Sequence, residues 1–171
     1  MKKLILFAVM MMFSAATPLW ATTVVQMDFD NQAIKADIVI VGTLIGSETS
    51  QWHGYPCTKA RVAVNEVIAG SLTGNEVELI EPGAGRFHVV GAKHLQNGEI
   101  YLLFLEKSPE GPYLLVGFNQ GAHLVTVEKT TARKVVLTRE PGKQAPGMTL
   151  DAARKRIRAV REQAGKTGTP K

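Results

Sequence analysis

The chain has 171 residues, a formal net charge of +5, 45% hydrophobic residues and a single cysteine. This composition is typical of a globular domain with a hydrophobic core, and it excludes collagen-like, low-complexity and disulfide-rich proteins. Residues 22–128 carry 6 basic and 12 acidic side chains (net −6), whereas residues 129–171 carry 12 and 3 (net +9) and no aromatic residue, so nucleic-acid binding is not expected.

The first 21 residues have the pattern of a secretory signal. Met1-Lys2-Lys3 is followed by an apolar run, residues 4–13, and by small residues up to Ala21. A basic start, a short apolar run and a small residue at the cleavage point are typical of such signals, and the run is too short to span a bilayer. We therefore expect an exported chain of residues 22–171, periplasmic or secreted, which is long enough for one domain.

A short helix and a central strand are predicted next. Asp28 can cap a helix over residues 28–37, in which Phe29, Ala33 and Ala36 fall on one side. The following run, residues 38–45, is apolar on both faces, so it predicts a strand that is covered on both sides. A glycine in its middle, Gly42, suggests a bend or a bulge.

Residues 46–58 form the least regular stretch and are predicted to be a loop. Trp52, His53 and Tyr55 would place large amphipathic side chains on its tip, where they either bind a partner or cap the open end of the core. The sole cysteine, Cys57, lies at the end of the same stretch. It is interpreted either as a small buried hydrophobe or as a reactive thiol.

The remaining strands follow from alternation and from turn residues. Amphipathic strands are predicted over residues 59–68 and 75–80, a tight turn at Asn97-Gly98, and a second strand that is apolar on both faces over residues 99–105. Residues 113–127 should form its antiparallel neighbour, which the glycines at 117 and 121 split into two strands. Residues 132–137 are predicted to form an edge strand. Together these elements predict a mainly β protein whose domain, residues 22–138, is a single small antiparallel barrel.

A linker, a helix and a tail are expected after the barrel. Residues 139–148 contain two prolines and two glycines and should be a linker. Residues 149–164 predict an amphipathic helix with a narrow apolar stripe, capped by Thr149. Its basic residues Arg154, Arg158 and Arg161 either form a solvated face or contact an acidic partner or anionic lipid. Residues 165–171 should be disordered.

No pattern in the sequence points to a reaction, a metal or a cofactor. The spacing of the four histidines matches no familiar zinc site. The sequence contains no phosphate-binding glycine loop and no nucleophile elbow. His53 and Cys57 are the one pair that hints at nucleophilic catalysis, and no orienting acid is identifiable for them.

Four stretches of the sequence resemble a family of uncharacterised bacterial secreted proteins. They are residues 36–42 (ADIVIVG), residues 62–70 (VAVNEVIAG), Gly98-Glu99 leading into residues 101–105 (YLLFL), and residues 117–121 (GFNQG). That family is similar to the barrel of tissue inhibitors of metalloproteinases and of netrin-like modules, which implies an OB-type fold over residues 28–127. Those inhibitors use an N-terminal cysteine to bind the zinc of their target. Here the expected N-terminus is Thr22-Thr23 and the cysteine is internal, so that mechanism is not carried over.

Three hypotheses about function follow, in order of preference. The first is an exported, non-enzymatic and monomeric binding module that recognises a protein or peptide through barrel-rim loops, at Trp52, His53, Tyr55 and Cys57; the resemblance suggests a secreted protease as one such partner. The second is an envelope-associated module whose C-terminal helix makes peripheral contact with anionic lipid or polymer. The third is an enzyme of unknown type.

Overall fold

The computed structural model describes residues 26–87, 94–118, 120–128, 131–137 and 147–167. The predicted signal, residues 1–21, and most of the predicted linker lie outside these residues. The described part contains two helices and eight strands, which are α2 (Phe29–Lys35), β1 (Ile38–Trp52), β2 (Tyr55–Ala69), β3 (Glu76–Pro82), β4 (Ile100–Lys107), β5 (Tyr113–Leu115), β6 (Ala122–Val127), β7 (Lys134–Val136), β8 (Met148–Thr149) and α3 (Leu150–Thr167).

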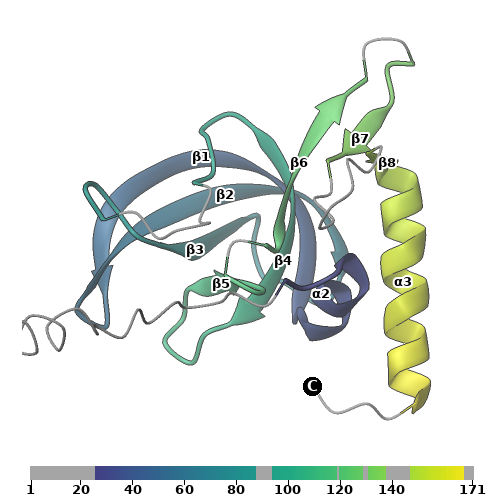
Figure 1. Ribbon diagram of the computed structural model, residues 1–171, viewed down its shortest axis with the longest axis horizontal. Helices are drawn as coiled ribbons and strands as arrows, with labels where there is room; N and C mark the ends of the chain where they lie inside the picture. Colours follow the sequence, from purple (N-terminus) through teal and green to yellow (C-terminus); the bar gives the residue numbers. More distant parts are fainter. Residues whose placement is uncertain (1–25, 88–93, 119, 129–130, 138–146, 168–171) are drawn as a thin grey trace, which may run out of the picture.

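Five of the strands form a closed ring (Figure 1). Each strand pairs with the next in the order β1-β2-β3-β5-β4, and β4 pairs back with β1. The protein is therefore mainly β, as the sequence predicts. The prediction of a purely antiparallel arrangement is wrong, because β3 and β5 are parallel: Leu79 lies opposite Tyr113 and Ile80 opposite Leu114.

The two strands that are apolar on both faces, β1 and β4, pair side by side, from Ile38 opposite Leu105 to Thr43 opposite Ile100. Alternate residues of these strands fill two separate clusters, one inside the ring and one beneath the helices. The bend expected at Gly42 is confirmed by a shift in register between Val41 and Gly42. A Cβ atom at position 42 would lie 2.4 Å from Cγ1 of Val62, so the close approach of β2 requires glycine there.

The segment from residue 46 to residue 58 is strand, and the predicted loop is wrong. β1 and β2 form one long antiparallel hairpin whose last pair is Trp52 opposite Tyr55. The turn consists of His53 (φ 51°) and Gly54 (φ 79°). Two successive residues with positive φ give the type of two-residue turn that matches the twist of a β-hairpin.

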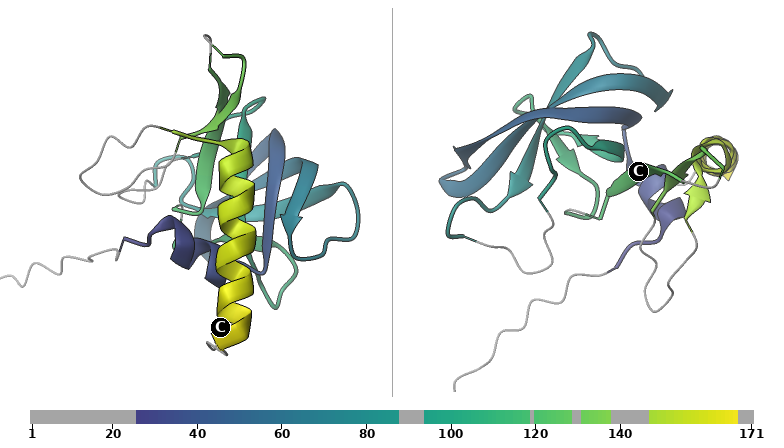
Figure 2. Two further views of the ribbon diagram at one scale, coloured as in Figure 1. Left: turned by 90° about the vertical axis from the view of Figure 1, so that its right-hand side faces the viewer. Right: turned by 90° about the horizontal axis from the view of Figure 1, so that it is seen from above.

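Both helices lie on one side of the ring (Figures 1 and 2). The cap predicted for α2 is confirmed, because the side chain of Asp28 accepts a hydrogen bond of 2.7 Å from the amide of Asn31. In α3 the amide of Ala152 donates to Oγ1 of Thr149. Helix α3 buries Leu150, Ala153 and Ile157 in the outer cluster, which also contains core residues of α2 and β4.

The C-terminal part of the chain differs in two respects from the prediction. Strand β7 is not an edge strand, because it lies between β6 and β8, and β8 begins at Met148 inside the expected linker. Helix α3 continues to Thr167, so residues 165–167 of the expected disordered tail are helical. An ion pair of 2.7 Å between Lys166 and Glu162, one turn apart, supports this last turn.

Candidate functional site

The tip of the β1–β2 hairpin is joined to the turn between β4 and β5. Nε1 of Trp52 donates a hydrogen bond of 3.1 Å to Oε2 of Glu110, and Nε2 of His53 lies 3.2 Å from Oε1 of the same carboxylate. The rings of Trp52 and His53 are 4.6 Å apart between centroids. One carboxylate thus holds two adjacent aromatic side chains, and we call Trp52, His53, Tyr55 and Glu110 the rim cluster.

Tyr55 is the most exposed member of the rim cluster, with 76% of its surface accessible. It stands opposite Trp52 in the last pair of the hairpin, next to the two-residue turn His53-Gly54. Tyrosine and tryptophan give large contact areas with few rotatable bonds, which is why they are enriched in protein interfaces. The structure therefore brings together three of the four residues that the sequence predicts for partner binding.

Cys57 is separate from the rim cluster, because it is buried and only 3% exposed. It pairs with Ser50, two positions further into the hairpin than Trp52. Burial raises the pKa of its thiol, whereas a reactive cysteine needs a lowered pKa and solvent access. This agrees with the interpretation of Cys57 as a small buried hydrophobe. His53 is instead exposed and bound to Glu110, so the two do not form a nucleophile and its base.

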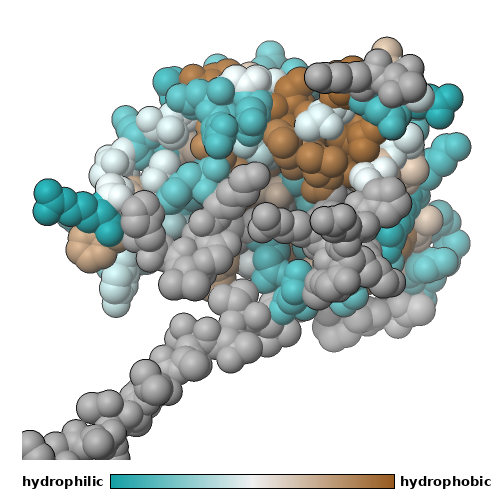
Figure 3. Space-filling view, turned by 45° about the horizontal axis from the view of Figure 1, so that its top comes forward, coloured by the Kyte–Doolittle hydropathy of each residue, from teal (hydrophilic) through white to brown (hydrophobic). Residues whose placement is uncertain are grey.

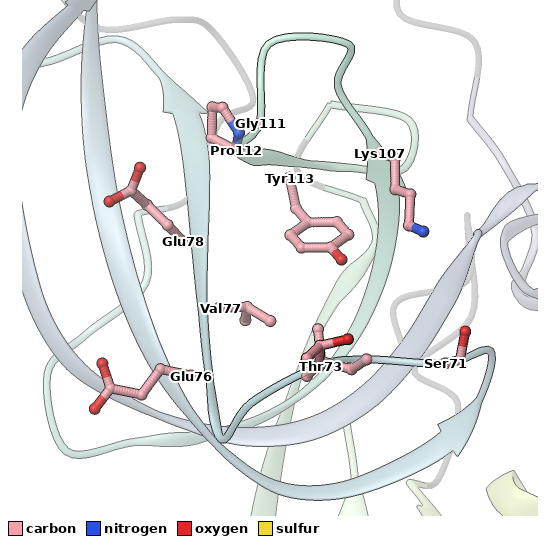
Figure 4. Close-up of a pocket in the computed structure, with 10 residues that line it drawn as sticks. Ser71, Thr73, Glu76, Val77, Glu78, Lys107, Gly111, Pro112 and Tyr113 are labelled. Atoms are coloured by element: carbon pink, nitrogen blue, oxygen red, sulfur yellow. The ribbon is translucent and has the colours of Figure 1, made fainter.

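A hollow of about 320 Å³ opens at the end of the ring where β3 and β5 meet (Figure 4). Its wall includes Gly111 and Pro112, which directly follow Glu110, so the hollow adjoins the rim cluster. Its lining also includes Val77, three hydroxyl-bearing residues (Ser71, Thr73 and Tyr113), Lys107 and two glutamates, Glu76 and Glu78. The sequence did not predict this hollow, although the alternation of β4 places Lys107 on the inward row that also holds Leu103 and Leu105.

Glu81, which the sequence places at the end of a strand, is a buried carboxylate with only 1% of its surface exposed. Its Oε2 accepts a hydrogen bond of 3.2 Å from the amide of Leu95 and lies 3.2 Å from Nδ1 of His94, whereas its Oε1 has no hydrogen-bond partner among the described residues. Burial is the main cause that raises the pKa of this carboxyl group. A second hollow of about 260 Å³, lined in part by His94, Leu95 and Thr58, lies beside this pair.

The three arginines predicted for lipid contact differ in the contacts that they make within the protein. Arg154 binds Glu66 on β2, with Nη2 2.6 Å from Oε2, and Arg161 donates to the carbonyl groups of Ala33 and Ala36 at the end of α2. Arg158 is exposed. Two of the three therefore anchor α3 to the rest of the protein and do not form a free basic face with Arg158.

His123 lies inside the protein, with its Nε2 2.7 Å from Oε1 of Gln32 and its ring against Phe29 and Phe104. Burial lowers the pKa of this histidine to about 4, so it is neutral at physiological pH. In the described part of the chain, no group of three or more histidine, cysteine or acidic side chains could hold a metal ion. Neither described helix combines the length and the apolar character needed to cross a bilayer.

A separate exposed apolar area lies away from the rim cluster. Figure 3 shows apolar side chains gathered in the upper right part of the view, which is the region of β6 and β7 in Figure 1. Val127 at the end of β6 and Leu137 after β7 are 58% and 47% exposed.

Comparisons with known proteins give no relative: no protein-family model matches the chain, and no curated protein matches it.

Proposed function

We propose that the five-stranded ring is an OB-type barrel that serves as an exported, non-enzymatic binding module for a protein or peptide. Two observations support the OB-type fold. The strands close in the order β1-β2-β3-β5-β4-β1, and the ring holds its own apolar cluster. OB-type barrels bind their ligands through the β1–β2 and β4–β5 connections. In this chain those two connections are His53-Gly54 and residues 108–112, and they touch each other.

The observation that carries the proposal is the bond between Trp52 and Glu110, which ties the hairpin tip beside an exposed tyrosine to the neighbouring turn. Tyr55 is held on a hairpin whose tip is tied to the neighbouring turn. A backbone segment that is already held in place loses less conformational entropy when a partner binds, so an exposed aromatic side chain on a tied hairpin tip is suited to binding. The apolar start of the chain, residues 4–13, supports export, and the resemblance to netrin-like barrels is consistent with this role.

Site-specific photo-cross-linking tests the proposal. A photoreactive phenylalanine analogue replaces Tyr55 in one variant and Phe118 in a control variant, because Phe118 is also an aromatic residue and is 61% exposed. In cells that produce the protein, we expect a discrete adduct from position 55 and none from position 118. The Glu110→Ala substitution should weaken the adduct at position 55. Equal adducts from both positions, or none from position 55, would overturn the proposal.

A further inference from the structure

The outer half of β1 is paired on one side and unpaired on the other. The ladder between β1 and β4 ends at Thr43, and the backbone of Leu44 then bonds to Gly98 and Glu99. Residues 46–52 pair with β2. In the described part of the chain, no backbone hydrogen bond joins their other side to any segment. We call this unpaired side of residues 46–52 the free edge.

The backbone groups of the free edge are open to an extended partner. The N–H and C=O groups of a strand point alternately to its two sides, so about half of those in residues 46–52 point away from β2. Edge strands that must stay unpaired usually carry lysine, proline or a bulge. Residues 46–52 contain neither lysine nor proline, and the shift in register lies at their start, between Leu44 and Gly46. Residues 47–49 are also exposed, so side chains do not cover the edge there.

The second hollow, of about 260 Å³, lies beside the free edge. It is lined by residues 47–49 and Thr58 of the hairpin and by Ala84-Gly85 and His94-Leu95. Successive side chains of a strand point to opposite faces, so three successive residues line one hollow where that hollow runs along the edge of the strand. The segment that starts at His94 thus joins β1 at Leu44, and the hollow separates it from residues 47–49.

We propose that the bound peptide is extended and adds to the free edge as a further strand, which enters the second hollow. The inference rests on the proposed function and deepens it, because the free edge ends at Trp52 of the rim cluster. An added strand binds through main-chain hydrogen bonds, which are what the unpaired groups of the edge can offer. A single strand lies between residues 47–49 and His94-Leu95, whereas a second copy of this chain would bring its own β2 into the space where His94-Leu95 lie.

Peptides with an altered main chain test the inference without knowledge of the natural partner. Random peptides are selected on the full-length protein, and an enriched peptide is synthesised with one N-methyl group at each position in turn. In an added strand, the N–H groups of alternate residues face the free edge. We expect methylation of every second residue to weaken binding by about tenfold or more, and methylation of the residues between them, which serve as the matched control, to change it by less than about threefold.

Amide hydrogen exchange locates the added strand on the protein. The amides of residues 46–52 that point away from β2 should exchange quickly in the free protein. The peptide should slow the exchange of alternate residues in this range by about tenfold or more. Residues 71–74, in the connection between β2 and β3, are the control and should exchange at the same rate with and without the peptide.

The outcomes separate this inference from the proposed function. Peptides that lose binding with Tyr55→Ala but tolerate methylation at every position and leave residues 46–52 unprotected would overturn the inference and leave the rim as the binding surface. Peptides that show the alternating pattern but bind Tyr55→Ala equally well would support the added strand and contradict the rim. Protection that appears without peptide and grows with protein concentration would assign the edge to a second copy and overturn the inference. If no peptide is enriched, the inference is overturned, and the cross-linking at position 55 still decides the proposed function.

Discussion

The indole Nε1 of Trp52 donates a hydrogen bond of 3.1 Å to Oε2 of Glu110, which joins the tip of the longest hairpin to a turn 58 residues further along the chain. Glu110→Ala should free this tip. Trp52 is the one tryptophan in residues 22–171, so the fluorescence anisotropy of a protein that consists of these residues reports its motion. We expect the anisotropy to fall, while the free energy of unfolding changes by less than about 1 kcal/mol, because the contact is exposed. Glu106→Ala is the control, and an equal fall in that variant would contradict the assignment.

The buried histidine should make the protein less stable in acid. Because burial lowers the pKa of His123 from 6.5 to about 4, the unfolded chain binds more protons than the folded protein between these values. Its contribution is fully present above pH 6.5 and is lost as the pH falls towards 4, by about 3 kcal/mol in total. Denaturant titrations at several pH values measure this loss. The free energy of unfolding should depend less steeply on pH in His123→Phe, and an unchanged dependence would show that another group causes the loss in acid.

The buried carboxyl group of Glu81 should have the opposite effect on the pH dependence of stability. Because its pKa is raised, its contribution to stability is present below the unfolded value of 4.5 and is lost as the pH rises through the folded value. Glu81→Gln removes the buried charge and keeps an oxygen for the amide of Leu95. We therefore expect the melting temperature of Glu81→Gln, relative to wild type, to be higher at pH 7 than at pH 4. Glu48→Gln, an exposed control, should show no such dependence.

The contact between α3 and the end of α2 can be tested at single arginines. Nη1 of Arg161 lies 2.6 Å from the carbonyl oxygen of Ala36 and 3.1 Å from that of Ala33. Arg161→Ala leaves both carbonyl groups without this donor, and chemical denaturation should show a loss of about 1–3 kcal/mol. Arg158→Ala, one turn earlier and exposed, should change the free energy of unfolding by less than about 0.5 kcal/mol. Similar losses in both variants would contradict the proposed anchoring role of Arg161.

Two glycines of β1 provide a matched pair for the packing of the ring. A Cβ atom at position 42 meets Cγ1 of Val62 at 2.4 Å and the carbonyl oxygen of Ala63 at 3.0 Å. At position 46 the nearest atom, at 3.3 Å, is the flexible end of Arg61. We expect Gly42→Ala to destabilise the protein by about 1–3 kcal/mol, and Gly46→Ala to have a much smaller effect. Thermal unfolding of the two variants measures the difference, and equal shifts would contradict it.

The elements that the sequence predicts correctly are those whose pattern is local. Residues 38–45 and 99–105 carry apolar side chains on both faces, and this requires cover on both faces, which the two clusters supply. The caps at Asp28 and Thr149 depend on a side chain and an amide three residues apart. Such signals can be read from a short window of sequence because the contacts that they describe lie within it.

The features that sequence analysis missed depend on contacts between distant residues. The outer half of the β1–β2 hairpin is rich in serine and threonine and has little apolar alternation, so only the pairing with β2 shows that it is a strand. Glu81 is followed by Pro82-Gly83 and resembles a turn residue, and its burial depends on His94 and Leu95. Lys107 was within reach of sequence reasoning, because it shares the two-residue period of Leu103 and Leu105.

The parallel contact between β3 and β5 joins only two residue pairs, whereas β1 and β4 are joined along six, from Ile38 to Thr43. The pairing between β3 and β5 is therefore the weakest in the ring. A transient opening there separates β5 from β3 and leaves the ladder between β1 and β4 intact. We therefore expect the amide hydrogens of this short contact to exchange with solvent far sooner than those of β4, and the ring to complete its closure late in folding.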